Sequence, residues 1–171
     1  VLVGDGGTGK SHLIADFIEG QEAIQQVSLL LLGQQIPASM DLISNLPNLL
    51  GCDITYHELF DTLESIACGQ GSRVLICIDA LNEGAGVSFW NHTLPGLVEF
   101  LKEYLHLGLL VSIRTQYEKT LFERQDLLYS NMLHIEHNGF SSVSYEAMHQ
   151  YFSFYGITTD SVVFPDTEFS N

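Results

Sequence analysis

Basic residues are scarce in this sequence. Lysine and arginine together number 6 in 171 residues, against 21 aspartates and glutamates, so the formal net charge is -15. A surface of this sign repels nucleic-acid phosphates, and we therefore expect no direct nucleic-acid binding by this domain. Two of the six basic residues, Lys10 and Arg114, fall inside the motifs described below.

Cysteine is also rare, and long apolar runs are absent. The three cysteines, Cys52, Cys68 and Cys77, are odd in number and lack the paired spacing of a metal site. With no secretory signal, this usage indicates a reducing, cytoplasmic location. No run approaches the ~20 apolar residues that span a bilayer, so no membrane partner is expected. The chain begins at Val1 within an apolar run, which predicts a fragment whose first strand is truncated.

The sequence is instead rich in short apolar runs that alternate with longer stretches of helical period. With 46% hydrophobic residues, the chain can bury one core. The alternation is typical of stacked strand-helix-strand units, so the fold class is α/β. Strands are predicted over 1–3, 27–32, 73–79, 109–113 and 132–136, and helices over 11–24, 56–68, 88–105, 117–128 and 145–155, with a loop and a short helix over 36–51. The pattern changes near Gly139, which predicts a domain boundary between residues 1-138 and 139-171.

A glycine-rich motif lies where the first strand ends. Residues 4–11 read Gly-Asp-Gly-Gly-Thr-Gly-Lys-Ser and satisfy G-x-x-x-x-G-K-[ST], in which main-chain N-H groups curl around phosphates at a helix N-terminus. Lys10 would reach the β and γ phosphates, and the Ser11 hydroxyl would ligate the Mg²⁺ that offsets their charge. The motif predicts ATP or GTP as the ligand. The residues expected to bind it are Gly4, Asp5, Gly6, Gly7, Thr8, Gly9, Lys10, Ser11 and His12.

The same stretch also satisfies G-x-G-x-x-G, the dinucleotide fingerprint. That motif requires an acid at the end of the second strand to hold the ribose. Here the second strand is followed by Gly33, Gln34 and Gln35, with no carboxylate. Lys10 and Ser11 are required only by the phosphate-loop interpretation, so we reject the dinucleotide one.

Two acids follow the third predicted strand. Asp79 ends an apolar run, a position from which a carboxylate can hold Mg²⁺ opposite Ser11. Glu83 lies four residues further on, where a loop can direct it at a water in line with the γ phosphate, as general base or water-positioning acid. The alternative for Glu83 is an ordinary exposed loop carboxylate.

Arg114 stands at the end of the fourth predicted strand. In open α/β sheets ligands gather at the carboxyl edge of the strands, where a guanidinium can contact the γ phosphate. The alternative is an ion pair with a nearby surface acid. His134 and His137 offer two metal ligands at most, and ordinary packing is the favoured interpretation of both.

With these motifs, residues 1–155 resemble the STAND branch of P-loop NTPases, the signal-transducing ATPases that include NACHT-type and bacterial antiviral proteins. In this branch a small residue follows the magnesium aspartate, and acids come three and four positions after it. Ala80 and Glu83 match this pattern, whereas Asn82 stands where many relatives have a second aspartate. Ser112-Ile113-Arg114 is similar to the Thr-Ser-Arg sensor strand of the family.

The resemblance implies a three-layer sandwich with a mainly parallel five-stranded sheet in the order 5-1-4-3-2, followed by a helical domain. It implies ATP as a latch, with ADP in the resting state, and Glu83, Lys10 and Arg114 as the catalytic set of a slow ATPase. It also implies self-assembly on activation, sensor and effector domains outside this fragment, and a role in antiviral defence. ATP is favoured over GTP by the resemblance, and no guanine-reading Asn-Lys-x-Asp is present.

Other functions stay open at this point. A nucleotide-binding module without turnover is permitted by Asn82. A DNA-associated ATPase on the related AAA+ plan is disfavoured by the charge of -15. A small-molecule kinase is disfavoured because no compact lid with extra arginines is visible.

Overall fold

The computed structural model describes residues 1–122, 132–139 and 144–156. The elements in chain order are β1 (Leu2–Gly4), α1 (Lys10–Ala23), β2 (Ser28–Leu32), the 3-10 turn η1 (Gly33–Gln35), α2 (Leu42–Leu49), α3 (Tyr56–Gln70), β3 (Val74–Asp79), α4 (Gly86–Leu101), β4 (Leu107–Arg114), α5 (Thr115–Phe122), β5 (Ile135–Glu136) and α7 (Ser144–Tyr155). The end of the helix predicted over 117–128 and the tail from 157 lie outside the described residues.

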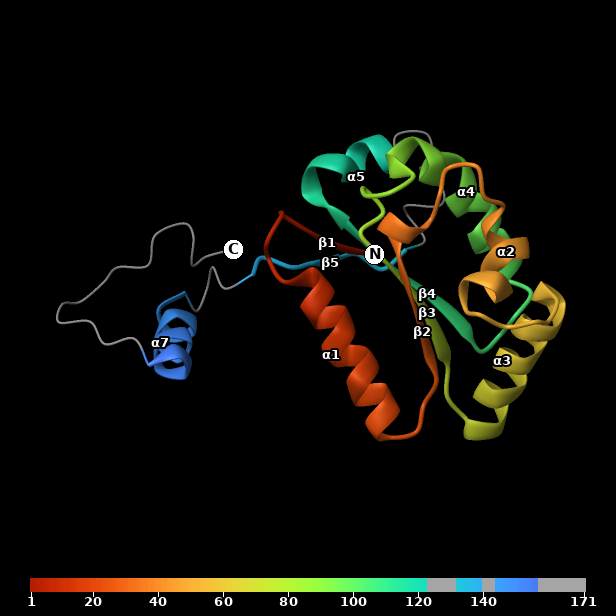
Figure 1. Ribbon diagram of the computed structural model, residues 1–171, viewed down its shortest axis with the longest axis horizontal. Helices are drawn as coiled ribbons and strands as arrows, with labels where there is room; N and C mark the ends of the chain where they lie inside the picture. The colour runs from red at the N-terminus through yellow and green to blue at the C-terminus, as the bar shows by residue number, and fades with distance from the viewer. Residues whose placement is uncertain (123–131, 140–143, 157–171) are drawn as a thin grey trace.

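The strands form one five-stranded sheet in the order β2-β3-β4-β1-β5, and every neighbouring pair is parallel. This is the predicted order 5-1-4-3-2, so the α/β fold-class prediction is confirmed. Figure 1 shows α1 on one face of the sheet and α3 and α4 on the other, which gives the three layers. Because parallel strands end at the same edge of a sheet, the loops that follow β1, β3 and β4 lie together at the carboxyl edge.

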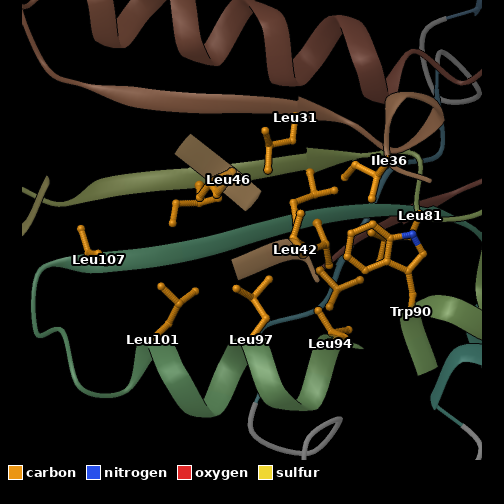
Figure 2. Close-up of a cluster of buried hydrophobic side chains, with 14 of the residues drawn as sticks. Leu31, Ile36, Leu42, Leu46, Leu81, Trp90, Leu94, Leu97, Leu101 and Leu107 are labelled. Atoms are coloured by element: carbon orange, nitrogen blue, oxygen red, sulfur yellow. The ribbon is translucent and has the colours of Figure 1, made fainter. Parts of the chain in front are cut away.

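The main core lies between the sheet and helices α2 to α5. Alternate residues of β3 enter it, because successive side chains of a strand point to opposite faces, and Val74, Ile76 and Ile78 are almost completely buried. Figure 2 shows leucines of α4 directed at the strands, with Trp90 beside Leu81. Trp90 is 0% exposed and belongs to this core.

The opposite face of the sheet is covered by α1. The apolar residues of α1 at helical spacing are Leu13, Ile14, Phe17 and Ile18, but only Ile14 is buried, and Leu13 is 44% exposed. Ile14 and Ile18 are four residues apart and share the stripe that packs on Leu2 and Cys77. Leu13 and Phe17 form the neighbouring stripe, in which Phe17 is half-buried and Leu13 is exposed.

The start of α3 is fixed by a local sequence signal. α3 begins with a capping box, in which the Thr55 hydroxyl accepts from Glu58 N at 3.3 Å and Thr55 N donates to the Glu58 carboxylate at 2.8 Å. The segment predicted as loop and short helix over 36–51 contains α2, and η1 lies directly before this segment. In the part of the chain that the structure describes, no helix is long and apolar enough to cross a membrane.

Candidate functional site

The glycine-rich loop joins β1 to α1 and depends on close backbone packing. A Cβ on Gly4 would lie 2.3 Å from the His137 carbonyl oxygen, so only glycine fits between these backbones. Gly9 is the N-cap of α1 with a φ of 92° and no side-chain cap. The first N-H groups of the helix therefore face the loop without an intrahelical partner, which is an arrangement that binds anions.

The Lys10 side chain folds over this loop. Its Nζ donates to the Gly4 carbonyl at 2.7 Å and to the Asp5 carbonyl at 2.6 Å. Burial lowers the pKa of Lys10, and the nearby Arg114 cation lowers it further, while Asp79 and Asp5 act in the opposite direction. Two cations facing one space favour an anion between them, because an anion relieves their mutual repulsion.

Ser11 and Asp79 meet across 68 residues of sequence. Ser11 Oγ donates to Asp79 Oδ2 at 2.6 Å, and Asp79 is 7% exposed. A hydroxyl and a carboxylate are the hard oxygen ligands that Mg²⁺ prefers, and Mg²⁺ bound to phosphates needs only one or two protein ligands beside its waters. The donor set therefore fits a magnesium ion held together with phosphates.

Glu83 and Arg114 are paired with each other. Arg114 Nη2 donates to Glu83 Oε1 at 3.2 Å, and both side chains are partly exposed. The Arg114 main-chain N-H also donates to Asn82 Oδ1 at 3.2 Å. The sequence left two alternatives for Arg114, a phosphate contact or an ion pair with an acid. The structure contains an ion pair, but the acid lies in the candidate site itself.

Ser112 belongs to the same cluster, although it was not among the predicted site residues. Its hydroxyl donates to Asp79 Oδ1 at 2.5 Å and accepts from Ala80 N at 2.8 Å, and the residue is 1% exposed. The signal for it was strand periodicity, since Ser112 lies two residues before Arg114 and so faces the same side of β4.

Most of these groups line one open cavity of about 280 Å³. Its lining residues are Gly6, Gly7, Gly9, Lys10, Ser11, His12, Asp79, Ala80, Asn82, Glu83, Ser112 and Arg114. Three residues predicted to bind nucleotide are not among them. They are Gly4, Asp5 and Thr8. Gly4 and Thr8 are buried, whereas Asp5 is exposed and its carbonyl accepts from Thr8 Oγ1 at 3.0 Å, a contact that helps to fix the shape of the loop.

The two histidines predicted to be ordinary residues have separate surroundings. His134 Nδ1 lies 3.4 Å from Glu118 Oε1, whereas the His137 N-H donates to the Val3 carbonyl at 2.7 Å. His137 Nε2 lies 3.6 Å from the place that a Cβ on Gly9 would take, so its ring flanks the phosphate loop. Within 1–122, 132–139 and 144–156, no three His, Cys, Asp or Glu side chains are grouped to hold a metal ion.

The sequence matches no protein-family model and no curated protein, but solved structures match its fold. The replication initiator DnaA bound to AMPPCP and single-stranded DNA gives a TM-score of 0.60 at 12% identity, over 94% of this chain and 47% of that chain. The Aeropyrum pernix ORC2 protein, in ADPNP and ADP complexes, gives 0.56 at 15% identity, over 96% and 47%. AMPPCP-bound DnaA from Aquifex aeolicus gives 0.55 at 12% identity, over 94% and 46%.

These neighbours share the P-loop NTPase fold of the AAA+ ATPases, and the chain spans about half the length of each. At these identities the likeness concerns the fold alone. The comparisons therefore support the P-loop NTPase fold, and the STAND resemblance stays a prediction from motifs.

The expectation that this domain does not bind nucleic acid is contradicted by these structural neighbours. The replication initiator DnaA, whose structure matches this fold, is bound to single-stranded DNA. The expectation rested on a net charge of -15, which sums the whole surface. A nucleic acid contacts a local patch, and the total charge does not describe that patch.

Proposed function

We propose that this chain binds ATP together with Mg²⁺ and hydrolyses it slowly, as the nucleotide switch of a larger signal-transducing protein of the STAND type with a role in defence. One observation carries the nucleotide part of this proposal. The Ser11 hydroxyl at the start of α1 and the Asp79 carboxylate at the end of β3 are expected to share a magnesium ion, and they lie 2.6 Å apart. They lie beside a glycine-rich loop that ends at a helix N-terminus.

In this proposal the phosphates occupy the cavity at the N-terminus of α1. The amides of the loop and the Lys10 ammonium bind them, and Lys10 exchanges its carbonyl partners Gly4 and Asp5 for phosphate oxygens. Ser11 and Asp79 hold Mg²⁺, which supplies neutralisation of the phosphate charge when bound. These contacts involve only the phosphates and do not select the base, so the choice of ATP rests on the family resemblance.

Hydrolysis is assigned to Glu83 and Arg114. Glu83 orients a water for in-line attack on the γ phosphorus and accepts a proton from it. The bond between the γ phosphorus and the bridging oxygen then breaks, and ADP and inorganic phosphate are released. Arg114 stabilises the charge on the γ phosphate. Asn82 in place of a second acid, and a Glu83 carboxylate already engaged by Arg114, both favour slow turnover.

The STAND assignment rests on Ala80, Glu83 and Ser112-Ile113-Arg114. A second candidate is an AAA+-type ATPase that acts with nucleic acid, which is favoured by the likeness to a DnaA bound to single-stranded DNA. The two differ in their response to DNA. Stimulation of ATP turnover by single-stranded DNA favours the AAA+ candidate, and turnover that is unaffected by DNA favours the STAND switch.

The nucleotide proposal is tested by calorimetric titration of the purified protein with ATP, ADP and GTP, with and without Mg²⁺. Lys10→Ala is expected to abolish binding, because it removes the ammonium that faces the phosphates. Lys102→Ala is the matched control, since Lys102 is an exposed lysine paired with Glu99 on α4. Equal nucleotide affinity in the Lys10 variant and the parent would exclude the proposed site.

A further inference from the structure

Resting on the proposed function, we infer that Ser112 is a positioning residue that fixes the magnesium carboxylate and the loop that carries Glu83. The Ser112 hydroxyl donates to Asp79 Oδ1 and accepts from Ala80 N, at 2.5 and 2.8 Å. Its carbonyl accepts from Leu81 N at 3.0 Å. One buried residue of β4 thus holds three consecutive residues, the last residue of β3 and the two that follow it.

The two oxygens of Asp79 have separate partners. Oδ2 accepts from Ser11 at the edge of the cavity, whereas Oδ1 is turned into the sheet and accepts from Ser112. A magnesium ion would compete with the Ser11 contact but leave the Ser112 contact in place. Ser112 therefore fixes the rotation of the carboxylate before metal binding, as outer-shell partners of metal ligands do.

The backbone after Asp79 needs such support. Ala80 has a φ of 58°, a left-handed conformation that is unusual for a residue with a side chain. A Cβ on Gly33 would lie 2.4 Å from the Ala80 carbonyl oxygen, so η1 packs directly against this turn. The Ser112 bond to Ala80 N restrains the turn from the β4 side. This turn sets the direction in which the loop carries Asn82 and Glu83.

Loss of the Ser112 hydroxyl is expected to change how nucleotide binding depends on Mg²⁺. Without the Ser112 hydroxyl, Asp79 loses the donor that orients it, while the loop amides and Lys10 are unchanged. Ser112→Ala should therefore retain metal-free binding of a fluorescent ADP analogue within about twofold. The Mg²⁺ concentration needed for half of the metal-dependent increase in affinity should rise by about 10- to 100-fold, the usual effect of losing an outer-shell partner.

Two further variants serve as the control and the rescue for this measurement. Ser28→Ala is the matched control, because Ser28 is on β2 of the same sheet and its buried hydroxyl has no partner among the described residues. Its Mg²⁺ requirement should equal that of the parent. Ser112→Thr keeps the hydroxyl on a residue suited to strands and should restore most of the Mg²⁺ affinity. Fluorescence of Trp90, the single tryptophan, reports whether each variant is folded.

The outcomes separate this inference from the proposed function. If the parent binds no nucleotide, the proposed function fails and the inference fails with it. If the parent binds but Ser112→Ala has the parental Mg²⁺ requirement, only the inference fails. An equal loss of metal-free and metal-dependent affinity also overturns it, since that pattern indicates a general structural role. If Ser112→Ala does not fold, Ser112→Cys, with nearly the same volume and a weaker donor, takes its place in the comparison.

Discussion

Arg114 Nη2 lies 3.2 Å from Glu83 Oε1, so the two residues proposed to act on the γ phosphate are bound to each other. Arg114 also lies beside the phosphate loop, with its Nη1 3.6 Å from the position of a Cβ on Gly6. The guanidinium is therefore within reach of both Glu83 and an anion at the loop. A γ phosphate would compete with Glu83 for Arg114. Bound ATP would therefore release the Glu83 carboxylate from its ion pair, whereas bound ADP would not.

Glu83→Gln is expected to bind ATP as tightly as the parent or more tightly. The substitution removes the base and weakens the competitor for Arg114, so hydrolysis should fall by about 10²- to 10⁴-fold, the usual contribution of a general base. Phosphate release and ATP affinity measured on the same preparation test both parts. Glu99→Gln is the control, because Glu99 is an exposed acid paired with Lys102. Parental turnover in Glu83→Gln removes Glu83 from the mechanism.

Arg114→Ala is expected to lose discrimination between ATP and ADP. A charge-assisted bond to the γ phosphate contributes about 1.5–3 kcal/mol, so ATP affinity should fall by about 10- to 100-fold while ADP affinity changes little. Titration calorimetry with both nucleotides gives the ratio. Arg73→Ala, an exposed arginine before the start of β3, should leave it unchanged. Equal losses for ATP and ADP would show that Arg114 does not recognise the γ phosphate.

The fold was predictable because the apolar runs of buried parallel strands are continuous and easily separated from helical periods. Boundaries were less accurate where the apolar run of an element is interrupted. β4 begins at Leu107, two residues earlier than predicted, because Leu107 and Gly108 pair with Val74 and Leu75 of β3. Sequence composition alone does not reveal this pairing, since a histidine and a glycine interrupt the apolar run.

The candidate site was predictable where a motif fixes residue types, and less so where neighbouring strands bring side chains together. Ser11 and Asp79 follow from the phosphate loop and the acidic strand end. The contact of Ser112 with Asp79, and of Arg114 with Glu83, depends on β3 and β4 being adjacent and in register. The left-handed Ala80 was not predictable either, because nothing in its residue type favours that conformation.

Gly4→Ala and Gly20→Ala are expected to change stability in opposite directions. A Cβ on Gly4 would meet the His137 carbonyl at 2.3 Å, and backbone must move to relieve it, which costs about 1–3 kcal/mol. Gly20 lies inside α1 with nothing within 4 Å of its Cβ position, so alanine there should add about 0.5–1 kcal/mol through helix propensity. Denaturant unfolding followed by Trp90 fluorescence measures both. A Gly4→Ala protein of parental stability would contradict the close backbone packing under the phosphate loop.

Cys77 is expected to resist thiol reagents in the folded protein. It is 0% exposed between α1 and the sheet, and burial raises its pKa to about 11. Only the thiolate reacts, so at pH 8 about one Cys77 in a thousand would be in the reactive form even if the reagent could reach it. Cys68 is exposed and should be modified first. In a Cys52→Ser, Cys68→Ser variant, modification should therefore require unfolding, and its rate at fixed pH should rise with denaturant in parallel with the loss of native Trp90 fluorescence. Rapid labelling of this variant under native conditions would mean that α1 does not stay packed on the sheet, and the phosphate loop at its N-terminus would then lack a fixed support.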